Sequence, residues 1–475
     1  MGADSSSVLA GYTEGNWSGT NLGYWDFAAI KISAAGDEIW RWQSGNTTSE
    51  LISAAALDQD GSVLLAGSMS VLYSYGYVGV KYPSVIKLDE DGNLLWRYSE
   101  ESSDVEDGVS AIAITDDGGV VVAGTTEEDY DVEFAAFKLD TNGELLWKWQ
   151  AGSVGGEDVL TAVVTAGDES GDIILGGRTD SYLTGTGGNL GFGHDFVAFK
   201  LDSAGTEIWR WQNGTDGSDY LKAAGMAADD SVVLGGYTWD GYSSDFFVIK
   251  LGGDGKEMWR WQGGSSADDE LTAVVIQPDG YVVAGQTQGR WSGSSTGGWD
   301  FAAAKLSLDG EEIWRWQGGS RGDDFMNAMA GNSDGKLVLA GETDSSWTEA
   351  NLGGEDFVAV MLDTGGSTTS SPVATPTGSP YTAPATSASS TSSSGIQQPT
   401  LDLPTGSPSA APAAVPPPTS VGIERLTPAP IATLASSVGT VVAPQLNTRV
   451  VVFFVCLFVH QLVVPSVFAR VSSMA

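Results

Sequence analysis

The chain has 475 residues and a formal net charge of −39 at pH 7, and residues 1–366 hold 59 of its 61 acidic but only 19 of its 22 basic side chains. A domain this acidic repels phosphate backbones, so we expect no nucleic-acid partner. One cysteine and two histidines exclude a disulfide framework and a thiolate or histidine cluster for zinc, and they argue against an imidazole-based nucleophilic triad.

An aromatic pair recurs along the first 366 residues at intervals of 50 to 62 residues. The pairs are Trp40/Trp42, Trp96/Tyr98, Trp147/Trp149, Trp209/Trp211, Trp259/Trp261 and Trp314/Trp316. A period of about 55 residues is long enough for four short strands and their turns. In one unit we predict strands at 271–277, 282–285, 300–306 and 312–319, with Asp-Gly hairpin turns after the first and third strands.

The predicted strands are rich in Val, Ile, Ala and aromatic residues and carry few charges, which is typical of sheets covered on both faces. No stretch of this region has a helical period. Four-stranded units of this kind favour an all-β protein, a β-propeller, over an open solenoid or a β-helix, whose rungs are usually shorter than this unit.

The third strand is recognisable seven times, and its first residues are Asp26, Ser84, Glu133, Asp195, Asp245, Asp300 and Asp356. The second strand also occurs seven times, whereas the first and fourth occur six times each. Seven blades fit this count best, and we expect two of them to be incomplete. Residues 3–13 align with residues 228–238, so we expect the natural amino terminus to lie upstream of Met1.

The order of the motifs resembles a known repeat family. An acidic pair, a Val-rich strand, an Asp-Gly turn and a V-V-A-G-x-T strand are followed by D-F-x-x-x-K-L, as in the SBBP-type β-propeller repeats of bacterial and some algal surface or secreted proteins. This resemblance covers about residues 1–365. Residues 87–99 (KLDEDGNLLWRYS) also resemble the Trp-bearing repeats of quinoprotein dehydrogenases and outer-membrane assembly propellers. The resemblance implies a fold but not a function, because propellers host many unrelated activities.

Residues that recur in every unit are interpreted as structural, because they serve what every blade needs. Strand alternation places the two aromatics of a pair on one face and the cation between them on the other. We expect the aromatics to fill the space between blades and the cations to pair with acids. These cations are Arg41, Arg97, Lys148, Arg210, Arg260 and Arg315, and the same interpretation covers Lys31, Lys87, Lys138, Lys200, Lys250 and Lys305 on the third strands.

Function is expected where the units differ, and they differ most in the loops between the second and third strands. In a four-stranded blade these loops share a face with the turns that join consecutive blades. The candidate binding residues on this face are Trp17, Trp25, Tyr75, Trp239, Trp291, Trp299, Trp347, Asp268 and Asp323. They could bind sugars by stacking and hydroxyl bonding, or the aromatics could fold inward and close their own loops.

The Asp-rich turns invite a calcium hypothesis, because Ca²⁺ prefers six to eight oxygen ligands. No loop has the full EF-hand pattern, and hairpin-turn chemistry explains residues 89–93 (DEDGN) better, so we predict no cofactor and keep Ca²⁺ only as a weak candidate. The alternative function is that of a propeller enzyme, a quinoprotein-like oxidoreductase or a carboxylate-based glycosidase. No acid pair stands out from the repeated ones and no cofactor motif is visible, so we assign no catalytic residue.

The composition changes after the repeats. Residues 366–448 are dense in Ser, Thr, Pro and Ala without hydrophobic periodicity, which predicts a disordered stalk. Residues 450–469 are mostly apolar between Arg449 and Arg470 and are long enough to cross a bilayer as a helix. A cleaved lipid-anchor signal is the alternative, and the six residues after the segment favour a retained span.

The order of head, stalk and apolar segment predicts a protein tethered to the plasma membrane with its propeller outside the cell. Sequons for N-glycosylation begin at Asn16, Asn46 and Asn213 and fit this placement. We therefore expect a binding module for an extracellular glycan or protein, attached to the membrane through residues 450–469.

Overall fold

The computed structural model describes the repeat region in segments. They are residues 7–13, 18, 25–33, 37–45, 49–58, 60–72, 78–100, 106–128, 131–153, 156–166, 170–183, 193–292, 297–331, 336–347, 356–362 and 373–374. The predicted stalk, apart from residues 373–374, and the apolar segment 450–469 lie outside these ranges. Among the residues described, every regular element is a β-strand, and no helix is long and apolar enough to cross a membrane.

The strands form seven antiparallel sheets, and within each sheet the strands follow one another in chain order. We name the strands of a blade a, b, c and d in that order. Strands a are β4 (Ser49–Leu57), β8 (Glu106–Ile114), β12 (Asp158–Thr165), β16 (Ser218–Met226), β20 (Asp269–Gln277) and β24 (Asp324–Gly331). Strands b are β1 (Ser7–Thr13), β5 (Val63–Leu72), β9 (Val120–Glu128), β13 (Ile173–Thr179), β17 (Val232–Trp239), β21 (Gly280–Thr287) and β25 (Leu337–Thr343).

Strands c and d complete the sheets. Strands c are β2 (Asp26–Ile32), β6 (Val78–Leu88), β10 (Asp131–Leu139), β14 (Asp195–Leu201), β18 (Ser244–Leu251), β22 (Asp300–Leu306) and β26 (Asp356–Leu362). Strands d are β3 (Glu38–Ser44), β7 (Leu94–Ser99), β11 (Leu145–Ala151), β15 (Glu207–Asn213), β19 (Glu257–Gly263) and β23 (Glu312–Gly318), with the short β27 (Val373–Ala374) beside β26.

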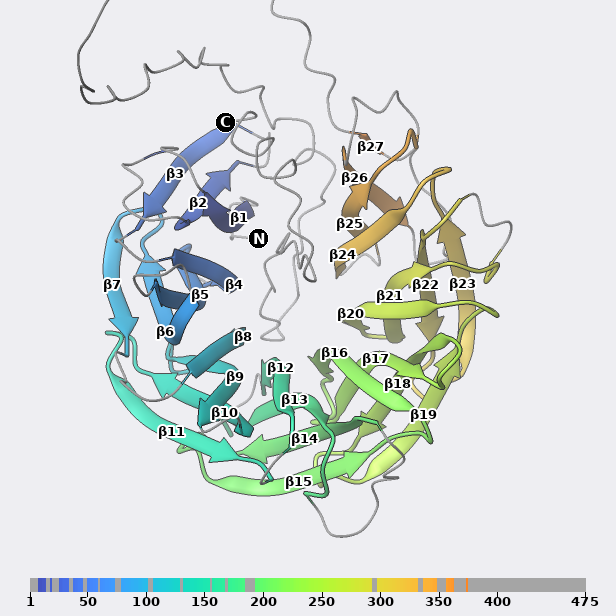
Figure 1. The fold of residues 1–475 in the computed structure, drawn as a ribbon, viewed down its shortest axis with the longest axis horizontal. Coiled ribbons are helices and arrows are strands. Elements are labelled where there is room, and N and C mark those ends of the chain that lie inside the picture. Colours follow the sequence, from blue (N-terminus) through green and yellow to red (C-terminus); the bar gives the residue numbers. More distant parts are fainter. Residues whose placement is uncertain are drawn as a thin grey trace, which may run out of the picture.

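The sheets are arranged around a common centre, with strands a innermost and strands d on the rim (Figure 1). This is a β-propeller of seven blades, as the repeat count predicts. Within the described residues the first blade has the three strands β1, β2 and β3, which take the places of strands b, c and d. The last blade differs from the prediction, because Val373 and Ala374 pair with Ala359 and Val358 and extend the sheet beyond the expected boundary at residue 365.

Most of the predicted Asp-Gly turns adopt the left-handed glycine conformation that hairpin turns require, whereas Gly280 has φ 151°. Gly61, Gly92 and Gly118 all have φ near +80°, a region that L-residues avoid. One turn uses Asp229-Asp230 instead, and Asp230 is the one described non-glycine residue with positive φ, at 62°. Aspartate tolerates this conformation better than most residues.

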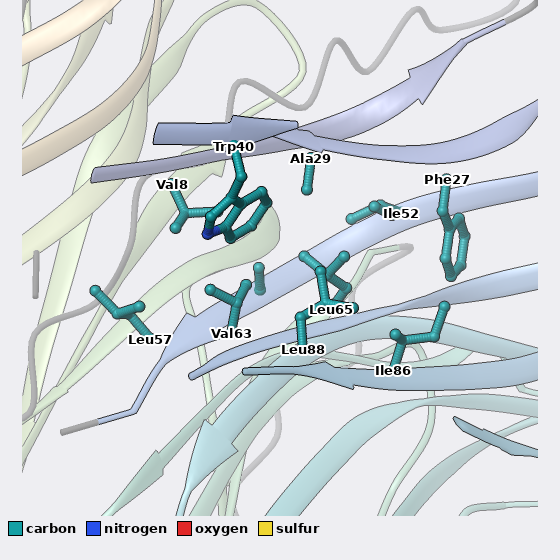
Figure 2. Packing of buried hydrophobic residues seen from close by; sticks show 11 residues of the cluster. Val8, Phe27, Ala29, Trp40, Ile52, Leu57, Val63, Leu65, Ile86 and Leu88 are labelled. Carbon is teal, nitrogen blue, oxygen red and sulfur yellow. The ribbon is translucent and has the colours of Figure 1, made fainter. Parts of the chain in front are cut away.

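The hydrophobic core lies between neighbouring blades. In the first junction, Phe27, Ala29 and Trp40 of the first blade face Leu65 and Ile86 of the second (Figure 2). Similar clusters join the later blades. Each of the five sheets between the first and the last blade is therefore covered on both faces, which explains why its b and c strands are almost continuously apolar.

In five of the six repeated pairs, the first Trp connects its blade to the next one. The Nε1–H of Trp209 donates to the backbone oxygen of Gly253 in the following c–d turn at 2.9 Å. A Cβ on Gly255 in that turn would lie 2.7 Å from the Trp209 ring, so only glycine permits this contact. Trp40, Trp96, Trp147 and Trp259 make the same bond to the next blade. The repeated aromatics are therefore structural.

The repeated cations are also partnered. The strand-c lysines are buried, and five of them reach a carboxylate: Lys87 to Asp58, Lys138 to Asp117, Lys200 to Asp172 and Asp230, Lys250 to Asp229, and Lys305 to Asp279. On strands d, Arg210 and Arg315 pair with the glutamates three residues before them. These pairs support the structural interpretation of both sets.

Candidate functional site

The b–c loops and the d–a turns meet on one face of the propeller, as expected. The backbone N–H of Ser244 donates to Asp268 at 3.0 Å, and that of Trp299 donates to Asp323 at 3.0 Å. Both acids belong to the turn that leads into the next blade. Two of the acids selected from the sequence therefore tie loops of neighbouring blades together.

The loop aromatics selected from the sequence divide into two groups. Trp291 is only 6% exposed, and its ring packs edge-on against Phe246 at 4.8 Å. Trp347 packs in the same way against Phe301 at 5.2 Å. These two side chains turn inward and close their own loops, so neither forms an open binding surface.

The remaining aromatics lie nearer the surface. Trp239 is 45% exposed at the end of β17, and the neighbouring Tyr242 is almost fully exposed. Trp25 contacts Tyr12, with ring centroids 5.8 Å apart, and Trp299 lies 6.1 Å from Phe325. Trp17 and Tyr75 lie outside the described residues.

Paired aspartates recur at the junctions between blades. Gln262 of strand d donates to Asp245 of strand c at 2.8 Å, and Asp269 of the next strand a lies beside Asp245. A Cβ on Gly264 would come within 2.6 Å of carboxylate oxygens of both acids. The same arrangement joins Asp195 to Asp219 and Asp300 to Asp324.

These carboxyl groups are buried, and their surroundings perturb them. Burial, with a smaller contribution from the acid of the preceding blade, raises the pKa of Asp219, Asp269 and Asp324 to about 6. Because all three side chains are fully buried, no substrate can reach them. The repeated pairs are therefore unsuited to the carboxylate chemistry of a glycosidase.

Within the scaffold strands, the blades also differ at a bulge in each strand a. In every strand a one residue is left out of the pairing with strand b, and a bulge of this kind redirects a side chain. The bulged residues are Ser53, Ser110, Thr161, Lys222, Thr272 and Asn327. Lys222 is the only charged residue among these six, and its side chain is exposed.

Lys222 belongs to a cluster that the other blades do not repeat. Its Nζ lies 5.5 Å from the centre of the Tyr237 ring, and that ring lies 5.1 Å from Tyr220 on the neighbouring strand. The guanidinium of Arg178, from β13 of the preceding blade, lies 5.6 Å from the Tyr220 ring. His194, just before β14, lies 5.3 Å from the same ring. We call Arg178, His194, Tyr220, Lys222 and Tyr237 the asymmetric cluster.

Two acids border the asymmetric cluster, and both are engaged. Glu157 accepts a hydrogen bond from Arg178 at 2.7 Å and lies 3.6 Å from His194. Glu270 of the next blade accepts from Gln286 at 3.2 Å. Burial raises the pKa of Glu270, whereas attraction from Lys222 lowers it in part.

The cations of the cluster are imperfectly compensated. Desolvation by the surrounding protein lowers the pKa of Lys222, and repulsion from Arg178 lowers it further, while Glu270 acts in the opposite direction. Burial and the negative charge of Glu270 raise the pKa of Tyr237, so its phenol stays protonated. Arg178 Nε and both ring nitrogens of His194 are buried without a hydrogen-bond partner.

The Asp-rich turns do not gather metal ligands. In the described part of the chain, no group of three or more His, Cys, Asp or Glu side chains is placed to hold a metal ion. Within residues 89–93, Asp89 accepts hydrogen bonds from the backbone N–H groups of Asp91 and Asn93. The carboxylate of Asp89 therefore stabilises its hairpin turn, which is the role that turn chemistry predicts.

Neither a protein-family model nor a curated protein sequence matches the chain. Solved structures that match include a protein of unknown function from Bacteroides caccae, with 12% identity over 65% of this chain and 93% of the other and a TM-score of 0.36. The Neurospora crassa Pan2 WD40 domain matches with 11% identity over 66% and 75% of the two chains and a TM-score of 0.40. Chaetomium thermophilum Sqt1, bound to the N-terminus of ribosomal protein L10, matches with 12% identity over 78% and 88% and a TM-score of 0.44.

Identities of this size and TM-scores below 0.5 assign no activity or partner to this chain. The SBBP and quinoprotein repeat types therefore remain resemblances. What the structure establishes is the seven-bladed propeller and, among its departures from exact repetition, the asymmetric cluster.

Proposed function

We propose that the protein is a non-catalytic interaction module whose protein ligand binds over blades four to six, at the asymmetric cluster. One observation carries the proposal: Tyr220, Lys222 and Arg178 occupy positions where the other blades have different residues. A repeated scaffold needs no such difference for its own stability. Tyrosine and arginine are also enriched among the residues that dominate protein interfaces.

A binding role fits the placement of the other charged groups. The buried aspartate pairs and strand-c lysines are used inside and between the blades, whereas Lys222 is exposed. Lys222 lies in β16 of the fifth blade. In the same blade, Trp239 at the end of β17 and Tyr242 in the following b–c loop offer further exposed aromatic surface. A protein ligand could contact the cluster and this loop together.

We further propose that the module is displayed outside the cell on the Ser/Thr/Pro-rich stalk and is held by residues 450–469 in the plasma membrane. The sequence supports this through the order of its segments and the apolar stretch between two arginines. Deleting residues 449–475 should move the protein from the membrane pellet to the soluble fraction. A deletion variant that still pellets with membranes would disprove the anchor.

A photo-crosslinking experiment tests the interaction module. The amino acid p-benzoylphenylalanine replaces Tyr220 in the full chain, and a matched variant carries it at Leu308, an exposed position in a c–d turn. Irradiation of producing cells should give discrete protein adducts from position 220 and none from position 308. Equal adduct patterns from the two positions, or no adduct from position 220, would contradict the proposal.

A further inference from the structure

The asymmetric cluster has more hydrogen-bond donors than acceptors available to a ligand. Its two acids each accept one hydrogen bond, Glu157 from Arg178 and Glu270 from Gln286. Within the described residues, no carboxylate oxygen lies within 4 Å of Lys222 Nζ, and the hydroxyls of Tyr220 and Tyr237 make no hydrogen bond. The ligand that fits such a set is rich in acceptor oxygens and poor in donors.

The charge of the cluster points the same way. Lys222 and Arg178 repel each other, and partial desolvation strengthens that repulsion. Glu157 is paired with Arg178, and Glu270 attracts Lys222 without forming an ion pair with it. By contrast, the buried lysines of strands c mostly have an acidic partner. A bound carboxylate would compensate both cations and accept from them in charge-assisted hydrogen bonds, which are stronger than neutral ones.

A neutral sugar fits this arrangement less well than a carboxylate. Sugar hydroxyls could accept from the same donors, but they carry no negative charge to offset the repulsion between Lys222 and Arg178. The donors also lie on both sides of the Tyr220–Tyr237 pair, with Arg178 and His194 near one ring and Lys222 near the other. A chain that carries acidic and apolar side chains in alternation can contact the donors and the rings together.

We propose that Lys222 and Arg178 bind carboxylates of an acidic peptide segment, whose apolar side chains pack on Tyr220 and Tyr237. This inference rests on the proposed function and specifies its ligand. The rest of the propeller is strongly acidic and repels such a peptide at long range, so the recognition is confined to the cluster.

The test uses the full chain and an array of acetylated, amidated nine-residue peptides. One, two or three glutamates are placed among alanine, leucine and serine, and a matched set carries glutamine at the same positions. Wild-type protein should bind members of the glutamate set and not their glutamine counterparts. Loss of one charge-assisted contact in Lys222→Gln or Arg178→Gln should weaken binding about tenfold or more.

Two controls separate a local effect from a general one. Lys256→Gln removes the same charge from a side chain that is 83% exposed in a c–d turn, and it should bind like wild type. Lys222→Arg keeps the charge and should retain binding. Melting temperatures of all four variants should match that of wild type, because Lys222 and Arg178 are not core residues. A variant that failed to fold would be identified by this measurement.

The outcomes distinguish this inference from the function on which it rests. Equal binding of both peptide sets, or equal losses in Lys222→Gln and Lys256→Gln, would overturn the carboxylate inference even if position 220 still crosslinks a partner. Tighter binding of oligogalacturonate than of any glutamate peptide would identify an acidic glycan instead and also overturn it. Failure of the crosslinking as well would remove the interaction module itself.

Discussion

Replacing Asp269 by asparagine should stabilise the protein at pH 8. The Asp269 carboxyl is fully buried beside Asp245. It accepts hydrogen bonds from the backbone N–H of Ser265 and from Thr287, while Gln262 donates to Asp245. Burial, partly offset by the bonds from Thr287 and Ser265, raises its pKa from 3.8 to about 6. A shift of about two units corresponds to about 3 kcal/mol.

The sign follows from proton binding. Because the pKa is higher in the folded state than in the unfolded chain, the folded protein binds more protons between about pH 4 and pH 6. The unfolding free energy therefore falls as the pH rises through this window, and above it the full penalty is present. Asparagine cannot ionise, so Asp269→Asn should be more stable than wild type by up to about 3 kcal/mol at pH 8, with little difference at pH 4.

Urea unfolding of the full chain, followed by tryptophan fluorescence between pH 4 and pH 8, measures this difference. Asp117→Asn is the matched control, because hydrogen bonds from Lys138, Thr115 and Gly119 outweigh burial and lower the pKa of Asp117 to about 2. Its carboxylate stabilises the fold above about pH 4, so this variant should be less stable than wild type by an amount that stays constant between pH 4 and pH 8. An Asp269→Asn variant that is less stable than wild type at every pH would refute the reasoning.

Two further predictions concern tryptophans. Trp40→Ala should lower the unfolding free energy by about 3 to 5 kcal/mol, because the ring is only 9% exposed in the first blade junction. Trp40→Phe should lose mainly the hydrogen bond to Glu90, about 1 kcal/mol. Equal losses in the two variants would show that packing between blades contributes little. In calorimetry, Trp291→Ala should lower the melting temperature by several degrees, whereas Trp239→Ala in the neighbouring blade should leave it nearly unchanged. The reverse order would mean that the b–c loops are not closed by their buried aromatics.

The strand order and blade number could be predicted because the same pattern of strands and turns recurs in every unit. Strand c of the sixth blade was expected at 300–306 and is Asp300–Leu306, and the Asp-Gly turns supplied the hairpin boundaries. Seven copies of one pattern average out the ambiguity that a single apolar run would have. The paired cations followed from the same repetition.

The orientation of single side chains could not be predicted in this way. Trp291 and Trp239 both lie in or beside b–c loops, yet one is buried and the other is exposed. The difference depends on Phe246 and on Gln317, which accepts from the Trp291 backbone N–H, and these partners are distant in sequence. Composition alone gives no sign of such contacts.

The asymmetric cluster was missed because its key position depends on a bulge. In Leu221-Lys222-Ala223 the alternation of buried and exposed side chains shifts by one residue, and the sequence shows only an apolar run interrupted by a lysine. A comparison of the six strands a would have identified it, since serine, threonine or asparagine stands at that position in every other blade. In a repeat protein, a residue that breaks the pattern within the scaffold strands is therefore more informative than a difference between loops. Length and composition stay constant in the strands, whereas both vary freely in the loops. Here that residue is a lysine that forms no ion pair within the described residues, although Glu270 attracts it, in a chain where acids outnumber bases almost three to one. We therefore look for its carboxylate partner in another molecule.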